Sequence, residues 1–133
     1  MFAHKLNPEQ RQALFDLAAS LAAEDEEVSE EEVNYLKHFS ETFNIEYNLD
    51  TSDLDINKAL KVFVSNESRI IALQELIKLS YKDGHFGKEE RDKVFLISQK
   101  MGLNDADLMI RIENWVRQGF DWMYEGEQIL AHK

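Results

Sequence analysis

The chain contains no cysteine, which excludes disulfides, thiolate metal ligands and cysteine nucleophiles. It has one proline and five glycines, too few for a flexible linker, and we expect residues 1–133 to form a single domain. No run of about eighteen apolar residues occurs, so we expect no membrane insertion. The first ten residues lack the layout of a secretory signal, and a cytoplasmic location is therefore expected.

Positive charge is also scarce. The 15 Lys and Arg residues are outnumbered by 26 Asp and Glu residues, which gives a formal net charge of −11. Because nucleic-acid binding requires clustered basic residues, we expect no nucleic-acid partner. An acidic chain attracts cations or a basic face of another protein, so the expected macromolecular partner is an unidentified protein. The charge is concentrated at residues 24–32, and such runs are usually solvated loops.

Apolar residues recur at helical spacing, and no segment shows sustained alternation of period two. We therefore predict an all-α, single-domain bundle of about six helices. Residues 44–53 are expected to form a connection before a short helix with Leu54, Ile56, Leu60 and Phe63 or Val64 facing inward. Gly102 is a predicted helix end, and the predicted N-caps are Asn7, Ser29, either Asn66 or Ser65, and Asn104.

One acidic segment is duplicated. Residues 25–32 recur without a gap as residues 83–90, so that Asp25 matches Asp83 and Val28 matches Phe86. An apolar helical run precedes and follows each copy. We interpret the pattern as two pseudo-symmetric helix–loop–helix repeats, at about 10–45 and about 68–103, followed by a C-terminal helix at about 105–130. The two repeats are expected to pack about a pseudo-twofold axis.

Helix capping explains part of this duplicated pattern. Ser29 and Glu32 form a predicted capping box, and Gly87 and Glu90 occupy the same places in the second copy. Glutamates in a first helical turn are also favoured by the helix dipole, by about 0.3–1 kcal/mol. The two aspartates fit this interpretation less well, because each follows the C-terminal end of a helix, where the dipole disfavours anions.

A shared metal site is the second interpretation. We call the two copies of the acidic segment, residues 25–32 and 83–90, the acidic bends. If they meet, Asp25, Glu32, Asp83 and Glu90 supply four carboxylates to one centre, with Glu31 and Glu89 as secondary candidates. Two carboxylates about 4 Å apart repel by roughly 4 kcal/mol at an effective dielectric constant near 20, so such a centre needs a cation or raised pKa values. Oxygen ligands favour calcium, magnesium or manganese over copper or zinc.

A lone EF-hand is not expected at either copy. The first two ligand positions of an EF-hand loop would fall on Leu21 and Ala23 in the first copy and on Leu79 and Tyr81 in the second. These residues belong to apolar helix faces and offer no side-chain oxygen for calcium, apart from the phenol of Tyr81.

The segments LAAEDEEVSEEEVNYLKHF and YKDGHFGKEERDKVFLISQKMGL resemble the duplicated A-D-G-x-apolar-x-x-x-E turns of the tellurite-resistance TerB-like family. The resemblance covers roughly residues 10–116, and Glu26 departs from it where the family prefers glycine. It implies an all-helical module that binds metal ions through these acidic residues and acts in stress-related or membrane-associated complexes. Tellurite resistance itself does not follow from it.

The expected function is accordingly that of a non-enzymatic TerB-like binding module with an acidic, divalent-metal-binding or partner-binding site, acting in a stress-related or scaffold complex. Two alternatives remain open. One is a metal-dependent hydrolase that uses paired carboxylates to activate water, which would need a partly apolar cleft beside the acids. The other is a purely structural helical scaffold in which the acids only cap helices.

The C-terminal segment is rich in aromatic residues, with Phe120, Trp122 and Tyr124 close together. We predict that these side chains pack into the core with the last helix. The alternative is an exposed aromatic patch through which the protein forms a homodimer or docks a partner.

Overall fold

The computed structural model describes residues 2–24, 28–81 and 86–133, and in these residues it is all-helical, as predicted. The elements are a 3-10 helix, η1 (Ala3–Lys5), and the helices α1 (Pro8–Ala23), α2 (Glu30–Phe43), α3 (Ile56–Lys61), α4 (Asn66–Ser80), α5 (Lys88–Met101) and α6 (Ala106–Leu130). No described residue belongs to a strand.

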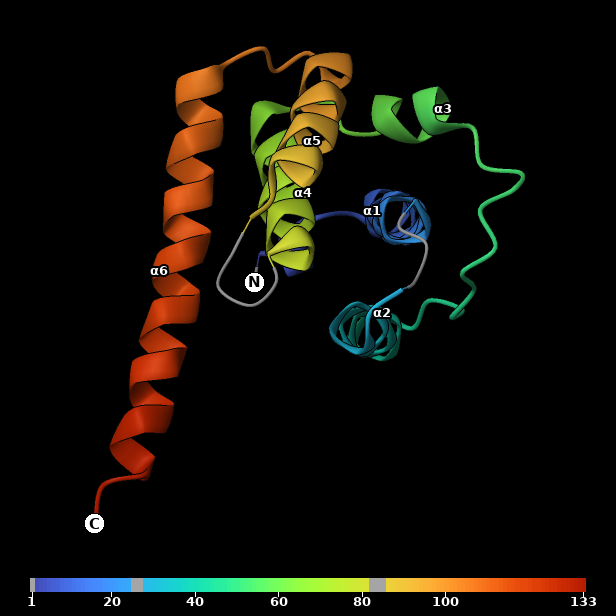
Figure 1. Ribbon diagram of the computed structural model, residues 1–133. Coiled ribbons are helices and arrows are strands. Elements are labelled where there is room, and N and C mark those ends of the chain that lie inside the picture. The colour runs from blue at the N-terminus through green and yellow to red at the C-terminus, as the bar shows by residue number, and fades with distance from the viewer. Residues whose placement is uncertain (1, 25–27, 82–85) are drawn as a thin grey trace.

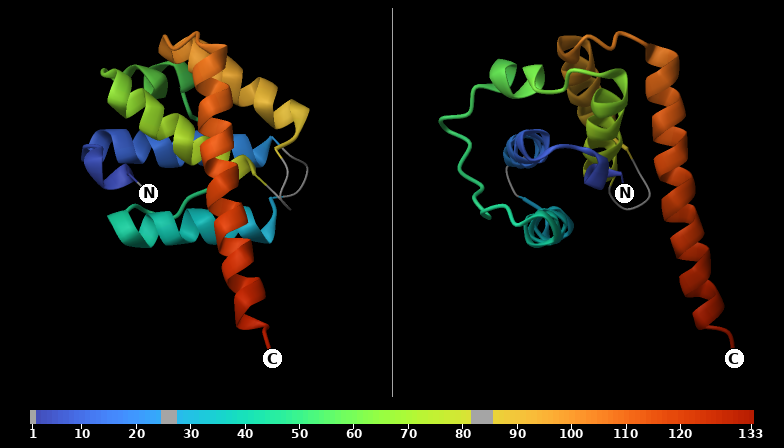
Figure 2. Two further views of the ribbon diagram at one scale, coloured as in Figure 1. Left: turned by 90° about the vertical axis from the view of Figure 1, so that its left-hand side faces the viewer. Right: turned by 180° about the vertical axis from the view of Figure 1, so that it is seen from behind.

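Two helices, α1 and α4, form the centre of the fold. Helix α1 contacts α2, α3 and α4, whereas α4 also contacts α2, α5, α6 and η1. Figure 1 shows α1 and α2 nearly end-on and α6 lengthwise, and the left panel of Figure 2 shows α6 crossing α1 and α2 steeply, with α4 and α5 inclined between these directions. The long connection after α2 passes around the outside of α1 to reach α3.

Both central helices are apolar on most of their circumference, which is typical of helices buried on several sides. In α1 the large side chains Phe15 and Leu17 are buried between alanines, and in α4 Leu73, Leu76 and Ile77 are inaccessible to solvent. The small alanine side chains allow neighbouring helices to approach α1 closely. This core positions the ends of α1, α2, α4 and α5.

The capping predictions are largely confirmed. Asn7, Ser29 and Ser65 each accept a hydrogen bond from the third amide of their helix. Gly102 ends α5 in the left-handed conformation, with φ of 99°. The prediction of Asn104 as the last N-cap is wrong, because the neighbouring Asp105 accepts from the backbone N–H of Leu108 at 3.0 Å and starts α6.

Helix boundaries recur at one spacing. The N-caps and left-handed ends fall 58 positions apart, at residues 7 and 65, 29 and 87, and 44 and 102. After α2 the N–H of Ile45 donates to Ser40 O at 2.9 Å, and after α5 the N–H of Leu103 donates to Ser98 O at the same distance. The duplication thus has matching local structure, whereas the pseudo-twofold axis stays a prediction.

Two core predictions are wrong. Ile56 is exposed, because α3 is short and turns Ala59 and Leu60 towards α1, with Phe63 following. The C-terminal aromatic residues do not pack into the core as a group: Trp122 is 75% exposed and Tyr124 63% exposed. The reason is that α6 continues to Leu130, past the end of the bundle (Figure 2).

None of the described helices combines the length and apolar character that a membrane-spanning segment requires.

Candidate acidic site

At the start of α2, Glu32 is a capping residue. Its Oε1 accepts from the backbone N–H of Ser29 at 3.1 Å, and the N–H of Glu32 donates to Ser29 Oγ at 3.1 Å. The residue is only 3% exposed, which is unusual for a glutamate unless its oxygens have partners. The capping box provides a partner for one of its carboxylate oxygens, and Glu31 beside it is exposed.

The start of α5 follows the same plan with different residues. Gly87 is the N-cap and provides no side-chain hydrogen bond, as its lack of a side chain requires. Glu90 is partly buried, and its carboxylate lies over the space that a Gly87 Cβ would occupy. Glu89 is exposed. Phe86, which immediately precedes Gly87, is buried, whereas its counterpart Val28, which precedes Ser29, is half-buried.

The other two predicted ligands, Asp25 and Asp83, lie outside the described residues. An ion pair links described residues near the two copies: Nζ of Lys93 in α5 is 3.2 Å from Oε2 of Glu24, the residue that follows α1 and precedes Asp25 in the sequence. Lys93 lies one helical turn after Glu90. The left panel of Figure 2 shows α2 and α5 both starting at the same side of the molecule.

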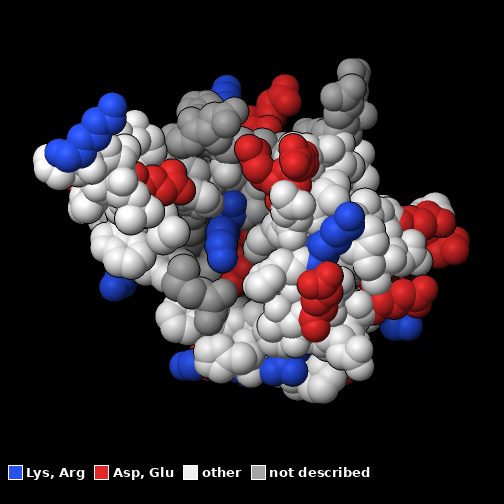
Figure 3. Space-filling model, turned by 90° about the horizontal axis from the view of Figure 1, so that it is seen from below, with Lys and Arg blue, Asp and Glu red and all other residues white. Residues whose placement is uncertain are grey.

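Within residues 2–24, 28–81 and 86–133, no three His, Asp or Glu side chains are grouped closely enough to hold a metal ion. Glu32 and Glu90 therefore do not form a centre with other described residues. On the face seen in Figure 3, carboxylates lie in several separate groups with Lys and Arg side chains between them. A cation centre of the predicted kind would therefore need ligands from outside these residues.

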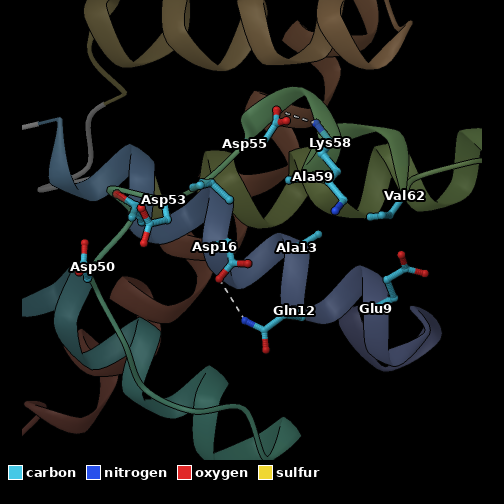
Figure 4. A pocket seen from close by; sticks show the side chains of 12 residues that line it. Glu9, Gln12, Ala13, Asp16, Asp50, Asp53, Asp55, Lys58, Ala59 and Val62 are labelled. Carbon is cyan, nitrogen blue, oxygen red and sulfur yellow. Dashed lines mark hydrogen bonds between the residues drawn. The ribbon is translucent and has the colours of Figure 1, made fainter.

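A second acidic feature, which sequence reasoning missed, is a cavity of about 570 Å³ between α1, the connection before α3, and α3 itself. Figure 4 shows the carboxylates around it, with Lys58 as the basic member of the lining; they are those of Glu9, Asp16, Asp50, Asp53 and Asp55. Neither Glu32 nor Glu90 belongs to it. The sequence signal was the run of aspartates at positions 50, 53 and 55 in a connection.

Several of these carboxylates have local roles. Burial raises the pKa of Asp16, although a hydrogen bond from Gln12 Nε2 at 3.0 Å partly opposes the rise. Hydrogen bonds from Ser52 lower the pKa of Asp50. Asp55 caps α3 by accepting from the N–H of Lys58 at 3.2 Å. The cavity favours cationic over anionic groups, since its lining is mostly negative.

Sequence reasoning also missed a buried polar contact between α2 and α4. The phenol of Tyr35 donates to Glu75 Oε2, and Glu75 is 4% exposed although it lies between core leucines of α4. Burial, followed by the nearby charge of Glu75 and this hydrogen bond, raises the pKa of Tyr35 well above 10.0. Both residues line a cavity of about 300 Å³ together with His38 and Lys78. A lone glutamate within an apolar stripe was the available signal.

Comparison with known proteins adds no relative: no family model, curated protein or solved structure matches this chain.

Proposed function

We propose that the protein is a non-enzymatic helical binding module of the TerB-like kind, in which the two acidic bends together hold one divalent cation. The cation would order the bends as a docking surface for a protein partner in a stress-related or scaffold complex. The proposed ligands are Asp25, Asp83 and Glu90, with Glu32. Oε1 of the Glu32 carboxylate already accepts from the backbone N–H of Ser29.

One observation carries this proposal: the ion pair between Glu24 and Lys93. It joins the residue before Asp25 to the turn of α5 that follows Glu90, so it supports the requirement that the two bends be neighbours. The recurrence of helix boundaries at the same spacing supports a common local geometry for both bends. Carboxylate ligands alone favour calcium, magnesium or manganese.

Thermal unfolding during titration with Ca²⁺, Mg²⁺ or Mn²⁺ tests the proposal. A site saturated at about a hundred times its Kd adds about 2.7 kcal/mol to the free energy of unfolding, which raises the melting temperature by on the order of 10 °C. The increase should disappear in the double variant Asp25→Asn, Asp83→Asn.

The matched control is Asp50→Asn, Asp53→Asn, which removes two carboxylates from the cavity of Figure 4 instead. It should keep the full increase in melting temperature. An equal increase in all three proteins, or none in the wild type, would contradict the cation site.

A purely structural scaffold is the second candidate, and the capping box of Ser29 and Glu32 favours it. In that case Glu32 and Glu90 only start helices, and the acidic bends serve solubility. The same titration separates the two functions, because a scaffold without a cation site shows no specific increase in melting temperature.

A further inference from the structure

Helix α6 extends beyond the bundle. Its first half buries Met109, Ile112 and Val116 against the core, whereas every residue from position 117 onward is exposed. The ring of Phe120 stacks on Tyr81 with the ring centroids 4.9 Å apart. Beyond this contact the helix projects away from the other helices, as Figures 1 and 2 show.

Beyond Phe120, α6 is amphipathic, and no other described element covers it. At helical spacing, one face presents Trp115, Trp122, Met123 and the pair Ile129–Leu130, and the opposite face presents Asp121 and Tyr124. Trp115, on the same face nearer the bundle, is stacked on by Phe2 with the ring centroids 6.0 Å apart. Trp122, Met123, Ile129 and Leu130 are each more than half exposed. Exposed apolar faces of this size mark interaction surfaces more often than free surface.

A groove marks the inner end of this face. It has a volume of about 510 Å³, lies between α6 and α4, and is lined mainly by apolar atoms from Trp115 to Met123, with Lys78 of α4 at one side. Its occupant must therefore be apolar and would be favoured by a negative charge near Lys78.

We propose that the occupant is a second copy of this chain, paired through α6 in the antiparallel direction. The outer half of α6 carries Asp121, Glu125 and Glu127 and, through Leu130, no Lys or Arg. The inner half carries Asp107 and Glu113 as well as Arg111 and Arg117, so its own charges cancel, and the groove beside it has Lys78 of α4 at one side. An antiparallel pair lays the outer segment of each copy, with Glu125 and Glu127, along the groove that Lys78 borders in the other copy, whereas a parallel pair would align the carboxylates.

The size of the surface agrees with a pair of helices. The apolar side chains of this face expose on the order of 500 Å² per copy, so a symmetric pair would bury on the order of 1,000 Å², near the lower limit for a specific interface. Gly119 and Gly126 lie on the same face, and a Cβ on either would meet no described atom within 4 Å. Glycines at these places allow close approach of a second helix.

The charge of the segment argues against a lipid surface as the occupant. Helices that lie on membranes usually carry Lys and Arg beside their apolar face, whereas this segment carries three carboxylates.

Sedimentation equilibrium of the full chain tests the proposal at physiological ionic strength, where a Debye length of about 8 Å screens the net charge. With increasing concentration the mass should rise from 15.6 kDa towards twice that value. Trp122→Ser should raise the dimer dissociation constant at least about tenfold, because buried tryptophans dominate such interfaces. Tyr124→Ser, an equally exposed aromatic change on the opposite face, should leave it unchanged.

Since Trp122 is largely exposed within one copy, both variants should retain the wild-type circular dichroism and melting temperature of the monomer. A mass of 15.6 kDa at every concentration would overturn the proposal. Equal weakening by both substitutions would also overturn it, and so would a protein that stays monomeric but binds lipid vesicles through Trp122.

The absence of cysteine allows the direction of pairing to be tested. The groove spans Trp115–Met123 and the apolar end of the helix spans Trp122–Leu130, which places the twofold axis near Met123. Under oxidation, Met123→Cys should form a covalent dimer. Leu130→Cys should not, because the two copies of position 130 would be roughly 20 Å apart. Equally efficient linkage at both positions would overturn the antiparallel arrangement.

Discussion

Helices α2 and α5 occupy the same place in the two copies of the duplicated segment, but they contact the rest of the molecule through different chemistry. Tyr35 of α2 and Lys93 of α5 are 58 positions apart, the spacing of the duplication. Tyr35 donates a hydrogen bond to the buried Glu75 of α4. Lys93 pairs with Glu24, and both side chains remain well exposed, at 32% and 48%. Each contact joins one copy to the other.

The difference shows that both copies of a duplicated position can link the two halves of the protein while contributing different amounts to the free energy of unfolding. Breaking a buried polar contact removes a hydrogen bond in a medium that cannot replace it. An exposed ion pair exchanges solvent contacts for protein contacts at little net gain. The contact of α2 should therefore matter more for stability than the contact of α5.

The largest expected effect is that of Tyr35→Phe. Loss of the phenol removes the donor to Glu75 and should lower the free energy of unfolding by about 1–3 kcal/mol, measured by urea denaturation. Tyr47→Phe is the control, because Tyr47 is partly exposed and contacts Phe15 only through its ring edge. A Tyr35→Phe protein as stable as this control would contradict the comparison.

The pH dependence of the stability of Tyr35→Phe tests the same contact in a second way. Because the pKa of Tyr35 is raised in the folded protein, only the unfolded chain ionises this phenol as the pH passes 10.0. The contribution of Tyr35 to wild-type stability should therefore be constant below that pH and fall above it, by up to about 1.4 kcal/mol per pH unit for one group. Tyr35→Phe should show a shallower fall, and Tyr81, whose pKa is raised by burial, should account for part of the remaining fall.

The next largest effect on stability is expected from substitutions at the N-caps of α2 and α5. Ser29→Ala removes the cap of α2 and should lower the free energy of unfolding by about 1 kcal/mol in thermal denaturation. Ser29→Gly and Gly87→Ser are mirror changes, expected to cost and to add a few tenths of a kcal/mol respectively. The added serine requires only the flexible Glu90 carboxylate to move aside. A large loss from Gly87→Ser would mean that this carboxylate cannot move.

The smallest effect belongs to the exposed pair. A double-mutant cycle of Glu24→Ala and Lys93→Ala should give a coupling energy of about 0.2–1 kcal/mol that decreases with added salt. A salt-independent coupling larger than that between Tyr35 and Glu75 would reverse the comparison.

Local signals predicted the helix boundaries well, because capping depends on a few consecutive residues. Ser29 and Glu32 specify the start of α2, and Gly102 specifies the end of α5 by its tolerance of positive φ. The prediction of Asn104 was wrong by one position, since the adjacent Asp105 is an equally good capping residue and accepts from the N–H of Leu108. The polar contact of Glu75 could not be predicted, because its partner Tyr35 is forty positions away and approaches only when α2 packs on α4.

The candidate acidic site also has features that local sequence predicted and features that it could not predict. The duplicated acids were visible as a pattern, and the role of Glu32 as a cap was predictable from Ser29. Their spatial relation was not, because it depends on tertiary packing; among the described residues, the Glu24–Lys93 pair links the residue that follows α1 to α5. The acidic cavity was missed since it needs residues 50–55 folded back over α1 (Figure 4).

The order of polar and apolar residues along the chain by itself determined an all-helical protein with two similar acidic helix starts. These properties follow from hydrogen bonds and side-chain periodicity within a few turns. Only the tertiary structure decided that Glu75 is buried and that Trp122 is not. Burial depends on where a helix ends relative to its neighbours, and α6 is longer than the bundle that supports it.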